Sequence, residues 1–530
     1  MALSSVIRDL KLSLSFSWTS CAITALGAWI LGLATLAVYR LYLSPLSKFP
    51  GPKLAALSKW YEAYYELVRI GKFSREIDRM HDVYGPIVRV TPYEVHIKDS
   101  QFYNGFYGYR DIEKHGWDVK IGNGNSILTT VHSDVHRRRR AALNPMFSRR
   151  SVMNLVPVIH DKLELLCKRF DEYVEGHKPI NLTKAFPALT GDIMMEYFFG
   201  FTYSHVEAPG FLSFHEAYMG FISSSHIATQ FPWFLPLMDS IPDSIVMRFF
   251  PLLASLIRLK QRAKAELTHP QDQWDLVGRS IKGQTTNESS RHTIIDQMLQ
   301  SDLPPSDLTQ QRITDEAQVI IAAGVETSSI CLTVGTFHIV NTPHIFTRLH
   351  QELVQAFPPN NANRRYIPEL IELEKLPYLK ACIQEALRLS YGMSSRNPRV
   401  YAGRELRYKE WTIPAGTPVA MTVVDVCHDE AIFPDSHSFI PERWLGNPKT
   451  HDGESLEHYL ITFGRGPRSC IGINVAMSEI AMTLGTMFRW YKFDLYESDI
   501  TDVRYEHDWH LPVPRLDSLG LRLTMTKVDN

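Results

Sequence analysis

The chain has 530 residues, of which 45% are hydrophobic and 21% are charged, and its formal net charge is -1. This composition can bury a large core, although the length alone would allow about three average domains. The near-zero charge argues against a nucleic-acid-binding protein, which usually carries a strongly basic domain. The one dense basic run, residues 137–140, is too short to change that conclusion.

A long uncharged segment lies near the N-terminus. No charged residue occurs from Leu12 to Tyr39, and residues 21–39 read CAITALGAWILGLATLAVY. About 20 apolar residues are needed to cross a bilayer, and the segment is longer than a typical signal-peptide core. It predicts a single-pass membrane anchor, with a cleaved signal or a buried helix as alternatives. Basic residues flank both ends, and their slight excess after the span favours a cytosolic globular body.

The sequence Lys-Phe-Pro-Gly-Pro at 48–52 cannot continue a helix and predicts a stiff connection to the globular body. We therefore divide the chain into an anchor and hinge region, residues 1–45, and one globular domain, residues 46–530. Helical patterns dominate this domain, so a mainly α fold with minor β structure is expected. The predicted elements are strands at 87–90 and 94–97, a long loop at 100–128, an exposed linker at 267–293, helices at about 314–340 and 376–389, and a hairpin at 408–424.

The six cysteines are scattered, and none forms a Cys-x-x-Cys pair. A cysteine-based zinc site is therefore not predicted, and sparse free thiols are typical of a reducing compartment. Cys470 differs from the other five because it lies in a glycine-rich segment, residues 463–472, that reads FGRGPRSCIG. An apolar helical stretch at about 473–487 follows, and a helix N-terminus favours a thiolate. Arg468 could neutralise an acidic group on a ligand.

A thiolate presented from such a loop is suited to ligating iron. The residues alone also allow a buried structural cysteine or a thiol nucleophile, for which His428 and His458 are candidate partners. The segment, however, resembles the haem-binding loop of the cytochrome P450 superfamily, which has the form F-x-x-G-x-R-x-C-x-G. Its fixed positions correspond here to Phe463, Gly466, Arg468, Cys470 and Gly472.

The resemblance implies the cytochrome P450 fold, with haem b between a long distal helix and a proximal cysteine loop in a single catalytic domain. Cys470 would ligate the iron, Arg468 would bind a haem propionate, and Phe463 would pack beside the sulfur. A thiolate ligand pushes electron density to the iron and favours O–O cleavage.

Two further motifs support the resemblance. Glu385 and Arg388 are three residues apart, so they share one face of a predicted helix and can pair. The family has an E-x-x-R motif at this position and a partner arginine before the cysteine, which corresponds to Arg443. The resemblance implies a structural triad of these three residues that holds the cysteine loop.

The long predicted helix contains Ala-Gly-Val-Glu-Thr at 323–327. Taken alone, this segment favours a helix with one polar stripe, although Gly324 could mark close approach of a ligand or a local distortion. In the family this pattern lies over the distal face of the haem. Glu326 and Thr327 would then relay protons to dioxygen while bulk water is excluded.

Haem propionates also need cations. Arg140 lies one helical turn after His136, at a place where the family often has Trp-x-x-x-Arg, and His136 replaces the tryptophan. Arg399 corresponds to a further propionate arginine of the family. The resemblance thus implies three additional cofactor-binding residues, for which plain surface charge is the alternative.

The implied reaction inserts one atom of dioxygen into an organic substrate. No Gly-x-Gly-x-x-Gly follows a predicted strand, so electrons would come from a separate NADPH-dependent flavoprotein reductase. The resemblance to membrane-anchored fungal secondary-metabolism members implies the endoplasmic reticulum and a hydrophobic small molecule such as a terpenoid. The aromatic stretch 211–250 and the 100–128 loop would roof the substrate pocket, with ordinary core as the alternative for the former. Two alternative functions are a rearrangement or dehydration at the same haem site and a non-enzymatic haem-binding protein.

Overall fold

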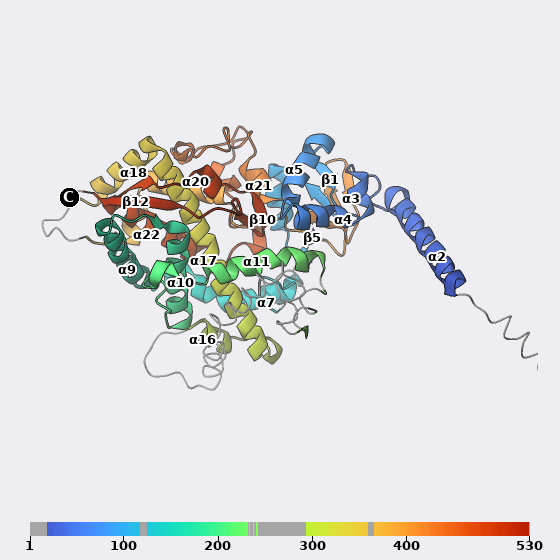
Figure 1. Ribbon diagram of the computed structural model, residues 1–530, viewed down its shortest axis with the longest axis horizontal. Helices are drawn as coiled ribbons and strands as arrows, with labels where there is room; N and C mark the ends of the chain where they lie inside the picture. Colours follow the sequence, from blue (N-terminus) through green and yellow to red (C-terminus); the bar gives the residue numbers. More distant parts are fainter. Residues whose placement is uncertain are drawn as a thin grey trace, which may run out of the picture.

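The computed structural model describes residues 18–116, 125–231, 233, 237, 240–241, 293–358 and 365–528. The expected linker at 267–293 lies outside these residues except for Thr293, and so does the end of the aromatic stretch from residue 242. Within the described residues, helices make up most of the body and several small sheets lie between them (Figure 1). The expected mainly α fold with minor β structure is confirmed.

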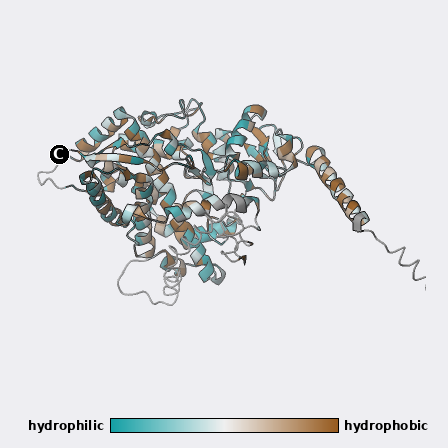
Figure 2. Ribbon diagram, in the orientation of Figure 1, coloured by the Kyte–Doolittle hydropathy of each residue, from teal (hydrophilic) through white to brown (hydrophobic). Residues whose placement is uncertain are grey.

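The first described helix, α2 (Trp18–Val38), continues into a π-helical turn, Tyr39–Leu43, and projects away from the body (Figure 1). It is apolar along its length (Figure 2), and its side chains are largely exposed. An exposed apolar helix of this length is what a bilayer would cover. The connection to the body is polar: Arg40 donates to the Leu57 carbonyl, and Arg89 Nη1 donates to the Arg40 carbonyl at 2.7 Å.

The core is built around α17 (Gln310–Asn341), which runs diagonally through the body (Figure 1). It is also apolar enough to cross a membrane, but it is mostly buried and packs against α10, α20 and α22. The helix was expected from about residue 314. It begins four residues earlier because the Thr309 hydroxyl accepts from the Arg312 N–H and caps the first turn.

The other helices wrap this central element. In chain order they are α3 (Lys53–Leu57), α4 (Trp60–Ala63), α5 (Phe73–Tyr84), α6 (Ser100–Gly108), α7 (Ser133–Leu143), α8 (Arg149–Met153), α9 (Val156–Glu175), α10 (Leu182–Phe199), α11 (His215–Gln230), α16 (Ile294–Leu299), α18 (Pro343–Ala356), α19 (Leu370–Leu373), α20 (Pro377–Ser390), α21 (Val423–Cys427) and α22 (Ile473–Trp490). The helices expected at 376–389 and about 473–487 are confirmed as α20 and α22, the latter extending three residues further.

The largest sheet lies beside α5, between the anchor and the helical part (Figure 1). Its strand order is β1-β2-β8-β5-β3, and the expected strand pair at its edge is confirmed, with Val88 opposite His96 in an antiparallel register. The strands are β1 (Ile87–Arg89), β2 (Val95–Ile97), β3 (Glu113–Lys114), β5 (Arg399–Val400) and β8 (Pro418–Ala420). Three smaller sheets contain β4 (Ile180–Asn181), β9 (Tyr491–Leu495) and β12 (Arg522–Lys527); β6 (Leu406–Tyr408) and β7 (Trp411–Ile413); and β10 (His507–Trp509) and β11 (Leu511–Val513).

Two expected elements were wrong. Residues 100–128 are not one long loop, because they contain α6 and β3. The Asp99 carboxylate caps α6 by accepting from the Gln101 and Phe102 N–H groups, and aromatic side chains at helical spacing, including Tyr103 and Phe106, are buried.

The stretch 408–424 is not a single hairpin either. The hairpin is β6–β7, and its turn lies at residues 409–410. The later Pro-Ala-Gly turn at 414–416 redirects the chain into β8, which joins the large sheet beside β2 and β5.

Candidate active site

The cysteine loop, residues 463–472, lies between α6 and the start of α22. Cys470 is exposed, and its backbone N–H donates to the Phe463 carbonyl at 2.8 Å, which closes the loop. Gly466 has a φ of +70°, and a Cβ there would lie 2.2 Å from the Tyr107 carbonyl oxygen of α6. Only glycine fits this close approach, so the position of the loop depends on Gly466. Gly472 caps α22, and the side chain of Phe463 packs on the main core.

The ionisation of Cys470 reflects two opposing influences. The surrounding protein atoms raise the pKa of the Cys470 thiol, while the Gly472 N–H and the Arg140 guanidinium lower it, and the net direction is upward. The N–H at the start of α22 thus favours the thiolate, as expected, but is outweighed by the surrounding protein atoms.

A group of basic side chains surrounds the loop. Arg468 Nη2 donates to the Val131 carbonyl at 2.6 Å, and Arg140 donates to the Ser469 carbonyl of the loop itself. Arg399 is buried on β5 and lies over the Tyr107 ring. Lys114 is buried on β3, directly opposite Arg399 in the strand register.

Neighbouring cations lower the pKa values of Arg468 and His136. Burial and Arg399 lower the pKa of Arg468 to about 10, and Glu113 is the carboxylate that opposes this effect. Burial and the neighbouring cations Arg468, Lys114, Arg140 and Arg399 lower the pKa of His136 to about 3. His136 is therefore neutral at physiological pH. A partly buried set of cations with little opposing charge favours an anionic ligand.

The expected structural triad is assembled at α20. Glu385 and Arg388 are both fully buried and form two hydrogen bonds, at 2.8 and 2.9 Å. Arg443 Nε donates to Glu385 at 3.1 Å, and the indole N–H of Trp444 donates to it at 2.9 Å. Burial raises the pKa of Glu385, but these partners lower it, and the net direction is downward.

This network is connected to the neighbouring loops. Arg388 also donates to the carbonyls of Cys427, Ser436 and Ser438. The Thr462 hydroxyl, at the start of the cysteine loop, donates to the Leu387 carbonyl of α20 at 2.8 Å. The triad thus fixes the helix to which the start of the cysteine loop is hydrogen-bonded.

On α17, Gly324 faces the neighbouring helix α10. A Cβ at this position would lie 2.3 Å from the end of the flexible Met194 side chain, so the absence of a side chain here lets Met194 pack closely against α17. The expected alternative of a local distortion is not seen, since α17 is continuous through this region.

Glu326 and Thr327 have different environments. Glu326 is buried at 1% exposure, and its Oε2 lies 2.9 Å from His215 Nδ1 of α11. The Thr327 hydroxyl donates to the Ala323 carbonyl one turn earlier, at 2.7 Å, and keeps its lone pairs as acceptors. The expected polar pair, Glu326 and Thr327, is therefore joined by His215 of α11, which contacts Glu326.

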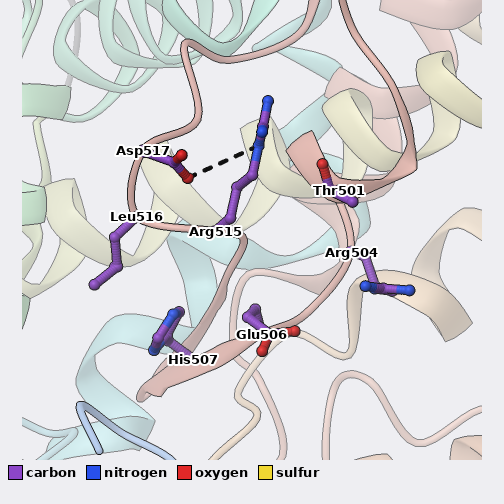
Figure 3. Close-up of a pocket in the computed structure, with 7 residues that line it drawn as sticks. All are labelled: Thr501, Arg504, Glu506, His507, Arg515, Leu516 and Asp517. Atoms are coloured by element: carbon purple, nitrogen blue, oxygen red, sulfur yellow. Dashed lines mark ion pairs between the residues drawn. The ribbon is translucent and has the colours of Figure 1, made fainter.

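The cysteine loop is distinct from the surface hollow at the C-terminal segment (Figure 3). That hollow has a volume of about 530 Å³, and Arg515 Nε lies 4.0 Å from Asp517 in it. Its lining residues are Thr501, Arg504, Glu506, His507, Arg515, Leu516 and Asp517. It mixes both charge signs and contains no cysteine, so it is not the site that the motifs define. His428 and His458, the candidate partners of a thiol nucleophile, bond instead to Tyr391 and Asn104.

Comparison with known proteins identifies the class. The family model described as "Cytochrome P450" matches residues 63–515, and the chain belongs to this family of haem-thiolate monooxygenases. It is 41% identical over 507 residues to "Cytochrome P450 monooxygenase sdnE" of Sordaria araneosa, covering 94% of this chain and 96% of that protein.

Two other relatives have names that state a reaction. "Tryptophan 6-hydroxylase fscE" of Fusarium equiseti is 35% identical over 94% of this chain and 96% of its own length. "N-acetyltryptophan 6-hydroxylase ivoC" of Emericella nidulans is 34% identical over 98% of this chain and 99% of its own length.

The residues present fit the haem that the family implies. Haem is a flat group with two acidic side chains, and the structure offers an exposed cysteine on a tight glycine loop beside several basic side chains. Sequence reasoning missed Lys114, because β3 lay in an expected loop, and His215, because nothing in the sequence relates it to a carboxylate 111 residues away.

Proposed function

We propose that this chain is a membrane-anchored monooxygenase that uses haem b, ligated by Cys470, to hydroxylate a hydrophobic small molecule. The observation that carries the proposal is the exposed Cys470 on a loop held by Gly466, with Arg140 bonded to the loop and further cations nearby. When bound, the haem would supply dioxygen activation, with electrons from a separate NADPH-dependent flavoprotein reductase.

The roles of the surrounding residues follow from their protonation. Arg140, Arg399, Arg468 and, in addition, Lys114 would neutralise the propionates. His136 is neutral, so it would contribute an N–H donor and no charge, as an indole would at the same place. Glu385, Arg388 and Arg443 would have a structural role, because they are buried and mutually satisfied.

Glu326 and Thr327 favour monooxygenation over the alternatives. A rearrangement or dehydration needs no protons for dioxygen, and a haem-binding protein without activity needs no acid and alcohol on a distal helix. Thr327 would hold water through its free lone pairs, and Glu326 would supply protons from a position with almost no solvent access.

The remaining proposals concern location and substrate. Residues 1–45 would be the anchor and hinge and residues 46–530 the catalytic domain, facing the cytosol from the endoplasmic reticulum. Exposed apolar residues at 54, 60 and 68, close to the point where α2 leaves the body, support contact with a bilayer. Among hydrophobic substrates we place a terpenoid first, and the names of two relatives make tryptophan derivatives the second class to test.

The first experiment is a carbon monoxide difference spectrum of the reduced full-length protein. A strongly red-shifted Soret band is expected for the parent and for Cys427→Ala, a buried cysteine, and should be lost in Cys470→Ala. A folded parent that takes up haem without this band contradicts thiolate ligation. Substrate is then tested by spin-state titration with terpenoids and with tryptophan derivatives, followed by product analysis with a reductase present.

A further inference from the structure

The carboxylate of Glu326 has one partner that reaches water. Its Oε2 is paired with His215 Nδ1 at 2.9 Å, while its other oxygen, Oε1, is buried without a hydrogen-bond partner among the described residues. The two side chains differ in access: Glu326 is 1% exposed and His215 is 19% exposed. A buried acid that must exchange protons needs such a contact, because water cannot reach it directly.

The charges around His215 favour its protonated form. Burial lowers the pKa of His215, but the charge and hydrogen bond of Glu326 and the charge of Glu216 raise it, with Lys184 of α10 opposing them, and the net direction is upward. Tyr218 lies near Glu326, and burial and this carboxylate raise its pKa, so its hydroxyl stays protonated.

The other elements that pack against α11 add little charge at this point. Among the described residues, these elements are β10 and the π-helical segment Tyr64–Val68, whose charged residues are Asp508 and Glu66 respectively; β10 also contains the titratable His507. Asp508 accepts hydrogen bonds from Ser394 and Ser395. The two groups do not rank among the causes of the His215 shift.

His215 is the first residue of α11, which crosses α17 (Figure 1). Its position therefore depends on the docking of α11 over α17. The contact between the two helices brings an accessible imidazole to the acid of the distal helix.

We propose that His215 supplies protons to Glu326 and orients its carboxylate during the monooxygenase reaction, which makes His215 a positioning residue for the proposed function. The imidazolium passes its Nδ1 proton to Glu326 Oε2, which leaves a neutral imidazole and a neutral carboxylic acid. Glu326 then delivers this proton to the distal face beside Thr327, and the imidazole regains a proton from water.

The test compares His215→Gln, which keeps a hydrogen-bond donor without charge, with His215→Lys, which keeps a proton-carrying cation. The control is His177→Gln, an exposed histidine remote from the site. With reductase and substrate, His215→Gln should form about tenfold less product per NADPH and release more hydrogen peroxide, because general-acid catalysis is lost. His215→Lys should restore part of the coupling.

The pH profile separates this role from a structural one. Coupled turnover of the parent should fall as pH rises above about 6.5 through the raised pKa of His215. This decline should disappear in His215→Gln and move to higher pH in His215→Lys. Unchanged coupling and an unchanged pH profile in all three proteins would overturn the proposal.

A readout without turnover completes the test. Thermal unfolding of the haem-bound parent, His215→Gln, Glu326→Gln and the double variant forms a double-mutant cycle. Coupling between the two positions is expected near neutral pH, and it should vanish at alkaline pH, where the imidazolium is lost. Additive effects at every pH would overturn the pairing. If the cycle shows coupling between the two positions but the parent forms no NADPH-dependent product, the pairing stands and the proposed function is contradicted.

Discussion

Two glycines of the cysteine loop have the same backbone conformation but different surroundings. Gly464 and Gly466 have φ values of +69° and +70°. A Cβ at position 464 would meet only ordinary contacts, the nearest at 3.9 Å, whereas at position 466 it would clash with the carbonyl of Tyr107. The two residues thus separate the cost of a left-handed backbone from the cost of a steric clash.

Gly464→Ala should cost about 1–2 kcal/mol, the usual penalty for a side chain in the left-handed region. Gly466→Ala should cost more, because the Tyr107 backbone must also move, and it should weaken haem retention. Measurements of thermal unfolding and of haem loss to an acceptor protein check both variants. Equal effects would show that the contact with α6 does not position the loop.

At the scale of elements, the best-supported polar contact is the one between α20 and the segment 427–444. Glu385 accepts from two guanidiniums, an indole and the Ile440 N–H, so its charge is fully compensated in the interior. The same helix carries an exposed pair, Lys380 with Glu457, at 54% exposure for each side chain. The two pairs offer a direct comparison of buried and exposed ionic contacts.

Glu385→Gln should lower the free energy of unfolding by about 3–5 kcal/mol, because it leaves Arg388 and Arg443 buried with reduced compensation. Lys380→Gln should cost less than about 1 kcal/mol, since water screens the exposed pair. Chemical denaturation of the haem-bound proteins measures both. A loss below 1 kcal/mol in Glu385→Gln would indicate that the network does not stabilise the fold.

A chain of neutral histidines joins α5, β2 and the residue before α21. His81 Nε2 lies 2.8 Å from His96 Nδ1, and His96 Nε2 lies 2.8 Å from the Thr422 hydroxyl. Burial lowers the pKa of His81 to about 4, and burial also lowers the pKa of His96. Each ring can donate on one side and accept on the other only while it is uncharged.

Because the folded-state pKa of His81 is depressed, its stabilising contribution is fully present above pH 6.5 and is lost as pH falls towards 4. The loss between pH 6.5 and 5 should be about 2 kcal/mol from this residue. His81→Gln should lower stability at pH 7.5 but flatten the acid dependence, which melting temperatures between pH 5 and 7.5 would reveal. The exposed His177→Gln is the control, and parallel curves for His81→Gln and the parent would contradict this account.

At the scale of the whole molecule, the sequence predicted the elements with strong periodicity and those with local motifs. The long helix, the E-x-x-R helix and the glycine-rich loop depend on residues close together in the chain, so their signals are local. Residues 100–128 were misread because Gly105 and Gly108 suggested a loop, while the buried face of α6 becomes evident only when its partners are known.

The site residues also divide into those with a local sequence signal and those whose role depends on contacts between distant segments. Cys470 and the triad were predicted because short local motifs around Cys470, Glu385 and Arg443 resemble those of the family. Lys114 and His215 could not be predicted, since their importance arises from contacts between distant segments, such as the pairing of β3 with β5 and the docking of α11 on α17.

The proposed attachment to the membrane would involve two surfaces of this molecule. The helix α2 is the first, and its removal should stop before Arg40, whose contacts with Leu57 and Arg89 belong to the body. Three exposed side chains near the same end, Leu54, Trp60 and Val68, are 65%, 69% and 67% exposed and form the second. These exposed apolar side chains would add apolar area to the proposed contact with lipid.

A protein lacking residues 1–38 should therefore keep its haem spectrum and still bind liposomes, although more weakly than the full chain. Adding Trp60→Ser and Val68→Ser should release it, because each removes apolar area that would enter the bilayer interface. Liposome flotation at low and high salt measures this, and high salt should not release the truncated protein if the contact is apolar. If the truncated protein without the two substitutions fails to float with the liposomes, α2 alone attaches the molecule. If the truncated protein with both substitutions still floats with the liposomes, the second surface lies elsewhere.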